Sequence, residues 1–240
     1  KDKAVNTFYS YKFIGLSPLS GGPVFDDYEE RQHELDGLSK YETFKKVLTA
    51  SGRREPYMSG NLTTNLSYKN IRLSGTFAYS LGAKVRLFQM YRSELIAPES
   101  NLRRELLDRW QNPGDEKHTN IPAVIGRYEP YYFTYNEHWS QTSYYNVQPF
   151  ASSLWNMYDY SDLRVVSGNY LKCNNLMVTY EFGERILSQL RMTRLALSLS
   201  GTNLFTISSK KLKGQTPTQG FTEVSLSDRP TYSFSLSVSF

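Results

Sequence analysis

The stretch that decides the fold is residues 231–240, TYSFSLSVSF. Every second residue is apolar or aromatic, and each residue between is serine or threonine. Because successive side chains of a β-strand point to opposite faces, the segment predicts a strand with one apolar face and one face of small hydroxyls. A strand on a water-facing sheet would usually carry Lys, Glu or Gln on its polar side. A tilted transmembrane strand needs about 9–11 residues, so the segment suggests a membrane β-barrel.

The same alternation returns along the chain, at residues 5–15, 62–68, 71–81, 175–182 and 194–201. A tight turn at Lys69 and Asn70 would join two of these segments into a hairpin. Weaker strands are predicted around residues 84–91 and 163–171. A closed barrel needs at least about eight strands, so this number is marginal for a small barrel and natural for part of a larger one.

Other segments interrupt the strand pattern. Residues 15–27 are rich in Gly, Pro and Ser and predict a turn. Ser39 and Glu42 have the spacing of a capping box, which predicts a short helix over residues 38–50 or, alternatively, a loop with one helical turn. Leu102, Leu106 and Trp110 form one helical stripe. Ser100 or Asn101 would cap that helix, and Pro113-Gly114 would end it.

The composition narrows the class of protein. Aromatic residues make up 15% of the 240 residues, which suits the aromatic girdles of membrane barrels but also a Tyr-rich sandwich. No run approaches the roughly eighteen apolar residues of a transmembrane helix. The single cysteine, Cys173, excludes an internal disulfide. The net charge is +5, but the basic residues are scattered. Their densest cluster, Lys210, Lys211 and Lys213, favours an exposed turn over a nucleic-acid site.

Nothing in the sequence predicts an enzyme. His33, His118 and His138 lack the spacing of metal ligands, and no Ser and His share a strand face. Two acidic pairs, Asp26-Asp27 and Asp115-Glu116, could hold calcium, but solvated acidic turns are the favoured interpretation. We therefore predict no catalytic residue, no metal site and no cofactor.

Six stretches, in order along nearly the whole chain, resemble the C-terminal part of the SusC/RagA family, the TonB-dependent outer-membrane transporters of Bacteroidota. They are YSYKFIGL at 9–16 with GPVF at 22–25, SYKN at 67–70 with FAYSLG at 77–82, DRWQNPGD at 108–115 with NIP at 120–122, SD at 161–162 through SGNYLK at 167–172 to NL at 175–176, NLFT at 203–206, and RPTYSFSLSVSF at 229–240. The family has a turn at its Asn-Leu-Phe-Thr motif. Residues 211–220 lack the acidic pair that usually follows in the family.

The resemblance implies an all-β fold. Residues 1–240 would be the C-terminal segment of a transmembrane antiparallel β-barrel of about 22 strands, with a plugged lumen and long extracellular loops containing short helices. Ser and Thr faces would line the lumen, and Leu, Phe and Tyr faces would meet outer-membrane lipid. The family's plug and TonB-contacting segment have no counterpart in these residues. We expect the sequence to be a fragment of a longer chain, or a processed chain.

The resemblance also implies a function in the cell outer membrane. That function is active import of large nutrients, glycans (oligosaccharides) or oligopeptides, energised by TonB and assisted by a SusD-like surface lipoprotein. No nucleic-acid partner is expected. From the residues alone, a self-contained small outer-membrane barrel acting as a porin or surface-binding protein is the alternative. A soluble β-sandwich is a third interpretation.

Two sets of residues are candidate sites. Within the aromatic-rich segment 128–145, Tyr131, Tyr132, Tyr135 and Trp139 could stack on cargo or contact the lid lipoprotein, although a place in the girdle or loop core is the favoured alternative. The terminal strand resembles the signal that the outer-membrane barrel assembly machinery recognises. The residues of that signal are Tyr232, Phe234, Leu236, Val238 and Phe240; as an alternative, Phe240 is only a girdle aromatic.

Overall fold

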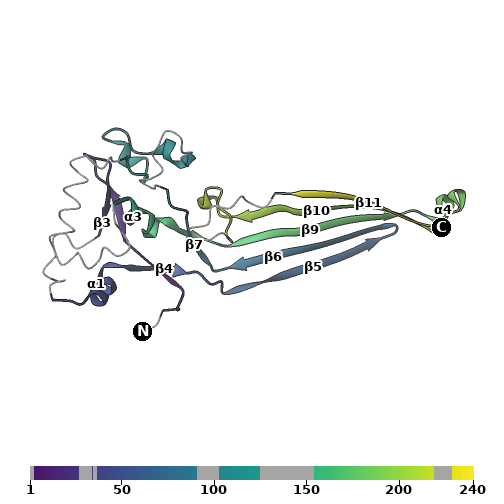
Figure 1. The fold of residues 1–240 in the computed structure, drawn as a ribbon, viewed down its shortest axis with the longest axis horizontal. Coiled ribbons are helices and arrows are strands. Elements are labelled where there is room, and N and C mark those ends of the chain that lie inside the picture. The colour runs from purple at the N-terminus through teal and green to yellow at the C-terminus, as the bar shows by residue number, and fades with distance from the viewer. Residues whose placement is uncertain (1–2, 27–33, 35–36, 91–102, 125–153, 219–228) are drawn as a thin grey trace. The chain divides into compact units, whose positions relative to one another are not determined.

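The computed structural model describes residues 3–26, 34, 37–90, 103–124, 154–218 and 229–240. The chain divides into two compact units (Figure 1). We call residues 55–83, 167–218 and 225–240 the sheet unit, and residues 1–54, 84–166 and 219–224 the loop unit. Within the described ranges, no helix is long and apolar enough to cross a bilayer.

The sheet unit is one five-stranded antiparallel sheet, in the order β11-β10-β9-β6-β5. Its long strands run side by side in Figure 1. The strands are β5 (Met58–Tyr68), β6 (Ile71–Leu81), β9 (Tyr170–Glu181), β10 (Arg194–Ser208) and β11 (Thr231–Ser239). Each alternating segment from residue 62 onward lies in one of these strands, except for the last residues Phe182 and Phe240, so the predictions of long alternating strands here are confirmed.

The connections differ at the two ends of this sheet. At one end, β5 and β6 are joined by Lys69, in the left-handed conformation (φ 51°), and Asn70, so the predicted hairpin is confirmed. At the same end, β9 and β10 are joined through the short helix α4 (Glu184–Leu190). The Asn70 side-chain amide donates to the Glu181 carbonyl over 2.8 Å. The long connections, residues 82–169 and 209–230, both leave from the other end.

One predicted turn is wrong, because residues 203–206 lie inside β10. Asn203 has φ 51°, and the β9–β10 register shifts between Thr202 and Phe205. Asparagine tolerates this left-handed conformation, so a bulge forms and pairing resumes at Phe205 opposite Cys173. The strand therefore continues through the motif.

The loop unit contains short strands where longer ones were expected. The predicted strand at residues 5–15 is two strands, because Tyr11 leaves the ladder and bridges to Ser161. Only three residues of each strand predicted at 84–91 and 163–171 form a strand in this unit. The last residues of the second segment, from Tyr170 onward, belong to β9 of the sheet unit. The pairs are β1 (Thr7–Ser10) with β4 (Thr49–Arg53), β2 (Phe13–Leu16) with β3 (Pro23–Phe25), and β7 (Lys84–Arg86) with β8 (Val165–Ser167).

The first predicted helix is confirmed as α1 (Lys40–Val47). Its capping box is complete: the Glu42 carboxylate accepts from the Ser39 amide at 3.0 Å and from the Ser39 hydroxyl at 2.7 Å, while the Glu42 amide donates to the Ser39 hydroxyl at 3.4 Å. These bonds to Ser39 lower the pKa of Glu42. A further helix, α3, spans Leu154–Asp159.

The second predicted helix is wrong in its described part, since only a 3₁₀ helix, Arg104–Asp108, forms there. Trp110 lies beyond it, where its amide donates to the Ile121 carbonyl at 2.9 Å and its indole N–H to Glu116 at 3.2 Å. A Cβ on Gly21, whose φ is 65°, would overlap the Trp110 ring. The loop after Asp108 is therefore docked on Gly21, which prevents helix propagation. The predicted caps, Ser100 and Asn101, lie outside the described residues.

The core of the loop unit gathers side chains from segments far apart in the chain. Burial raises the pKa of the Tyr158 phenol to about 12 and that of Tyr11 still further. The buried cluster consists of Tyr11, Phe25, Val47, Leu48, Met90, Leu106, Trp155, Met157 and Tyr158. The loop unit thus has a core independent of the sheet.

Candidate functional site: a two-faced sheet and a buried arginine cluster

One face of the five-stranded sheet is apolar across its whole width. Directly paired residues of an antiparallel ladder share a face, so the register fixes which side chains are neighbours. One row across the strands is Tyr68, Ile71, Tyr180, Leu197 and Leu236. The next row is Leu66, Leu73, Val178, Leu199 and Phe234. This apolar face extends over all five strands.

The described part of the chain leaves the apolar face uncovered. Leu66 is 60% exposed, Leu199 57% and Phe234 68%. Soluble monomers rarely expose contiguous apolar patches larger than a few hundred Å². The face therefore needs an apolar environment or a partner.

The opposite face carries small hydroxyl groups. Thr179 and Ser198 are directly paired, and their hydroxyls lie 2.9 Å apart. One row across this face is Ser67, Arg72, Thr179, Ser198 and Ser235, and the next is Asn65, Ser74, Met177, Ser200 and Ser233. Small side chains of this kind leave room for another polar surface to approach closely.

The terminal strand β11 forms one edge of the sheet. It pairs with β10 from Thr231 opposite Thr202 to Ser239 opposite Arg194, and no strand among the described residues pairs with its other side. The alternation predicted for this segment is confirmed. The residues of the predicted assembly signal within the strand, Tyr232, Phe234, Leu236 and Val238, all lie on the apolar face, and Phe240 follows the strand. The predicted cargo or lid residues, Tyr131, Tyr132, Tyr135 and Trp139, lie outside the described residues.

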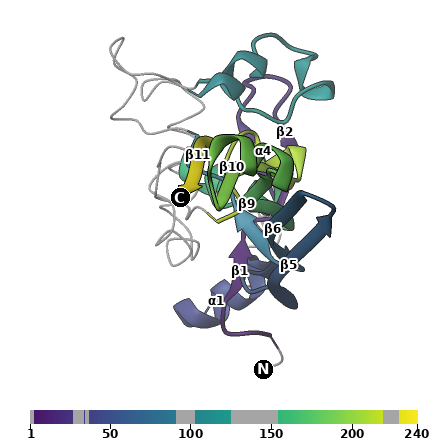
Figure 2. The ribbon, with the colours of Figure 1, turned by 90° about the vertical axis from the view of Figure 1, so that its right-hand side faces the viewer.

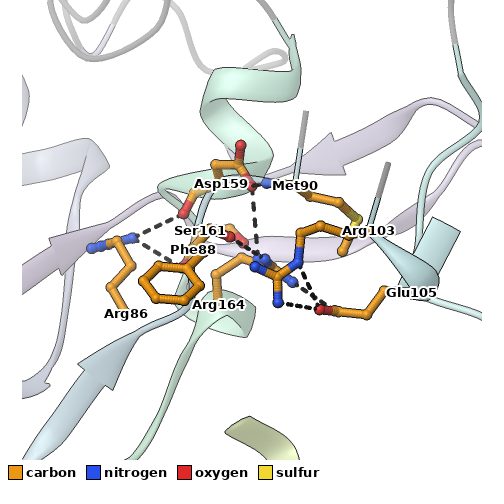
Figure 3. Close-up of polar contacts among 8 residues, drawn as sticks. All are labelled: Arg86, Phe88, Met90, Arg103, Glu105, Asp159, Ser161 and Arg164. Atoms are coloured by element: carbon orange, nitrogen blue, oxygen red, sulfur yellow. Dashed lines mark hydrogen bonds and ion pairs between the residues drawn. The ribbon is translucent and has the colours of Figure 1, made fainter. Parts of the chain in front are cut away.

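The loop unit contains a cluster of buried charges (Figure 3). Arg86 lies between the rings of Phe8 and Tyr160, at 5.3 and 5.2 Å from their centroids. Burial lowers its pKa to about 10, so it remains charged at neutral pH. Its guanidinium donates to the Ser10 hydroxyl at 2.9 Å and to the carbonyls of Tyr9, Ser161 and Asp159 at 3.1, 3.3 and 3.4 Å.

Arg164 extends this cluster. Its guanidinium donates to the Phe88 carbonyl at 2.6 Å and forms ion pairs with Glu105 at 3.3 Å and Asp159 at 3.8 Å. Asp159 in turn accepts from the Met90 amide at 2.9 Å, and Arg103 pairs with Glu105 at 2.8 Å. Figure 3 shows these residues converging from three stretches of the loop unit, residues 86–90, 103–105 and 159–164. The cluster joins those segments.

This cluster was not predicted from the sequence. Arg86 stands in an apolar run, VRLF, and a lone charge in such a run is a signal for a buried, hydrogen-bonded side chain. Its partners, however, lie 73 to 77 positions away in the chain, and no local pattern identifies them.

Three of the four carboxylates considered for calcium have other partners, and the fourth, Asp27, lies outside the described residues. Asp26 pairs with Lys12 at 3.1 Å. Asp115 accepts from the amides of Asn112 and Gln111 at 2.9 and 3.0 Å, and these bonds lower its pKa. Glu116 accepts from the Gly114 amide at 2.8 Å. In the part of the chain that the structure describes, no group of three His, Cys, Asp or Glu is placed to hold a metal ion.

Solved structures of the RagAB peptide importer are similar to this chain. The "open-open" state matches with a TM-score of 0.56 at 16% identity, over 100% of this chain and 24% of that chain. The "closed-closed" state matches with a TM-score of 0.58 at 16% identity, over 98% of this chain and 23% of that chain. A structure of the RagAB peptide transporter matches with a TM-score of 0.52 at 18% identity, over 90% of this chain and 20% of that chain.

No protein-family profile matches the sequence, and no curated sequence matches it either. The chain spans about a quarter of the length of the first RagAB chain that it matches. At identities of 16–18%, the likeness concerns the fold. The chain therefore shares its fold with part of a RagAB importer chain.

Proposed function

We propose that this chain forms part of the barrel wall and the loops of an outer-membrane active importer. The observation that carries the proposal is the uncovered apolar face of the sheet. The fold of this chain also matches part of a RagAB chain, and the match covers 100% of this chain. Lipid would cover the apolar face, as it does in outer-membrane barrels. The opposite, hydroxyl-rich face would line the lumen and pack against a plug.

The connections give an orientation within this proposal. Outer-membrane barrels have short periplasmic turns and long extracellular loops. The Lys69-Asn70 turn and α4 would then face the periplasm, and the long connections at residues 82–169 and 209–230 would face the outside. The loop unit would belong to the extracellular surface.

A larger barrel is part of the proposal. The sheet has two edges among the described residues, β5 and β11, and unpaired edges are not tolerated in the lipid core. We propose that these strands close with further strands into a barrel of about 22, with a plug and a TonB-contacting segment elsewhere in the protein. A SusD-like lipoprotein would cover the loops, and the cargo would be oligopeptides or oligosaccharides.

Deletion of the gene and affinity purification test this function. The deletion strain should lose growth on one class of large nutrient, supplied as sole source, and keep growth on the free amino acids or monosaccharides. A tagged native protein, extracted in detergent, should retain a surface lipoprotein. Two results together would favour the small porin instead. They are unchanged growth of the deletion strain on both oligopeptides and oligosaccharides, and passive leakage of solutes through the purified protein in vesicles.

The aromatic segment 128–145 supplies a prediction about cargo or lid contact. Under the interpretation that these residues contact cargo or lid, the double change Tyr132→Ala and Trp139→Ala should reduce uptake by the full transporter at least about fivefold, because each lost aromatic contact is worth roughly 0.5–1.5 kcal/mol beyond its buried area. Uptake of labelled cargo at equal surface levels is the measurement. Unchanged uptake would assign these residues to a structural role.

The terminal residue supplies a prediction about assembly. Deleting Phe240, or changing Phe240→Asp, should lower the amount of folded barrel in the outer membrane several-fold, because the last side chain of the signal is lost. Ser239→Asp, on the hydroxyl face, is the matched control. The heat-modifiable band in gel electrophoresis of outer-membrane fractions measures folded protein. Equal assembly of all three forms would refute the signal role of Phe240.

A further inference from the structure

The helix α4 (Glu184–Leu190) is amphipathic and uncovered. At 100° per residue, Ile186, Leu187 and Leu190 share one side, while Arg185, Ser188 and Gln189 share the other. Ile186 is 38% exposed and Leu190 49%. Figure 2, seen from this end of the sheet, shows α4 in front of the strands. A connection that contains this seven-residue helix exposes more apolar surface than a polar turn would.

The helix is held firmly at the end of the sheet. The Phe182 amide donates to the Leu195 carbonyl at 3.0 Å, and the Thr193 amide donates to the Ser239 carbonyl at 2.9 Å. At its C-terminus Arg191 adopts the left-handed conformation (φ 53°), and its amide bonds back to the helix. Because both flanks are paired with neighbouring strands, α4 has a fixed place beside the last row of the ladder.

Aromatic side chains of the apolar face lie at this same end. Tyr180 and Phe182 are in an edge-to-face contact with centroids 5.0 Å apart. The Lys69 ammonium lies 5.3 Å from the centroid of the Tyr68 ring. Tyrosine and lysine at the end of an apolar surface are typical of the boundary between acyl chains and headgroups.

The charge around α4 is positive. Residues 69–72 and 181–194 contain five cationic side chains, Lys69, Arg72, Arg185, Arg191 and Arg194, and two carboxylates, Glu181 and Glu184. One of the carboxylates, Glu181, is paired with Arg194 at 3.3 Å. Arg185 and Arg191 are exposed. Arg72 and Arg194 lie on the hydroxyl face. Lys69, Arg185 and Arg191, against the single carboxylate Glu184, remain at this end, and they are complementary to anionic phosphates.

We infer that α4 is an interfacial anchor, which inserts Ile186, Leu187 and Leu190 at the boundary of the phospholipid leaflet on the short-connection side while Arg185 and Arg191 bind lipid phosphates. The occupant is the phospholipid surface itself, since the helix connects β9 and β10, two strands that carry the apolar face, and is amphipathic with Arg185 on its polar side and Arg191 at its C-terminal cap, as in helices that lie in a membrane interface. The inference rests on the proposed lipid contact of the sheet. It adds a headgroup-binding surface beyond the barrel wall.

Spin labelling of the native protein, reconstituted in vesicles of phosphatidylethanolamine and phosphatidylglycerol, tests the inference. Cysteines are placed one at a time at residues 185–190, and at Leu199 and Leu236 on the apolar face; Cys173 is buried and does not compete for label. For each spin label, the accessibility to oxygen is then compared with the accessibility to a water-soluble nickel chelate. We expect high oxygen accessibility at 186, 187 and 190, and high nickel accessibility at 185, 188 and 189.

The strand sites separate this inference from the proposed function. Lipid-like values at 199 and 236, with nickel accessibility throughout α4 or protection from both reagents, would overturn the anchor and leave the barrel proposal standing. Water-like values at 199 and 236 would overturn both.

A second measurement tests the arginines, using spin-labelled phosphatidylglycerol and phosphatidylcholine. The change Arg185→Gln should lower the preference for phosphatidylglycerol about fivefold, and adding Arg191→Asn, which tolerates the left-handed backbone, should lower it by a similar factor again. Arg104→Gln, an exposed arginine of the loop unit, is the matched control and should leave the preference unchanged. Equal preference in all variants would overturn the phosphate contact.

Discussion

Replacing Arg86 with methionine is expected to unfold the loop unit while the five-stranded sheet keeps its pairing. The guanidinium supplies donors to three carbonyls and one hydroxyl from two separate segments, residues 9–10 and 159–161. Methionine fills a similar volume but donates nothing. Each buried acceptor that loses its donor costs about 1–3 kcal/mol, and we expect a total near 3–5 kcal/mol because the losses are not additive.

Hydrogen exchange on the purified native protein measures this effect. Amides of β1 and β7 should lose protection in Arg86→Met, while those of β9 and β10 should keep it. In Arg86→Lys, the protection of these amides should be intermediate between the unchanged protein and Arg86→Met, since an ammonium cannot span the same acceptors as a planar guanidinium. Arg104→Met, on the surface of the loop unit, is the control. Full protection of β1 in Arg86→Met would contradict a joining role for the cluster.

The second large loss of stability is expected from a substitution on the apolar face. Leu62 lies near the middle of β5 and is 61% exposed, whereas the next residue, Thr63, points to the hydroxyl face. An arginine facing lipid near the bilayer midplane costs about 2–4 kcal/mol, so Leu62→Arg should shift the urea unfolding midpoint strongly downward. Thr63→Arg should have a much smaller effect.

The pair forms its own control, because the two substitutions add the same side chain at adjacent positions. The fraction of protein that remains folded at each urea concentration, measured in lipid vesicles, gives both free energies of unfolding. If Thr63→Arg destabilised the protein as much as Leu62→Arg, the assignment of the lipid face would be reversed or lost.

Alternation predicted the strands well because a period of two residues is a local property. Residues 71–81 and 231–240 keep that period without interruption, so their faces follow from the sequence alone. The first residues of β5 were missed because Gly60 and Asn61 offer no apolar alternation. There the cross-strand partner Tyr79 covers the glycine, with its hydroxyl 3.0 Å from where a Cβ of Gly60 would lie.

Tertiary contacts explain what local patterns failed to predict. The stripe of Leu106 and Trp110 predicted a helix, but Trp110 is buried through its docking on Gly21 instead. The continuation of β10 past Asn203 depends on pairing with β9, which lies elsewhere in the sequence. The same holds for Arg86: a buried charge was visible in principle, while its acceptors were not. Of the two candidate sites, the terminal segment forms the predicted alternating strand over Thr231–Ser239, and its role as an assembly signal stays a prediction.

If the sheet spans the outer membrane as proposed, the length of β5 has a consequence for the bilayer around it. Its eleven residues span about 37 Å along the strand, and a tilt near 45° would reduce this to a height of about 26 Å. A typical hydrocarbon core is about 30 Å thick, and the bacterial outer membrane is thinner than average. Lipids with short acyl chains would match the sheet without distortion. In thicker bilayers the protein would draw the two leaflets together around itself, so acyl-chain length would tune its stability.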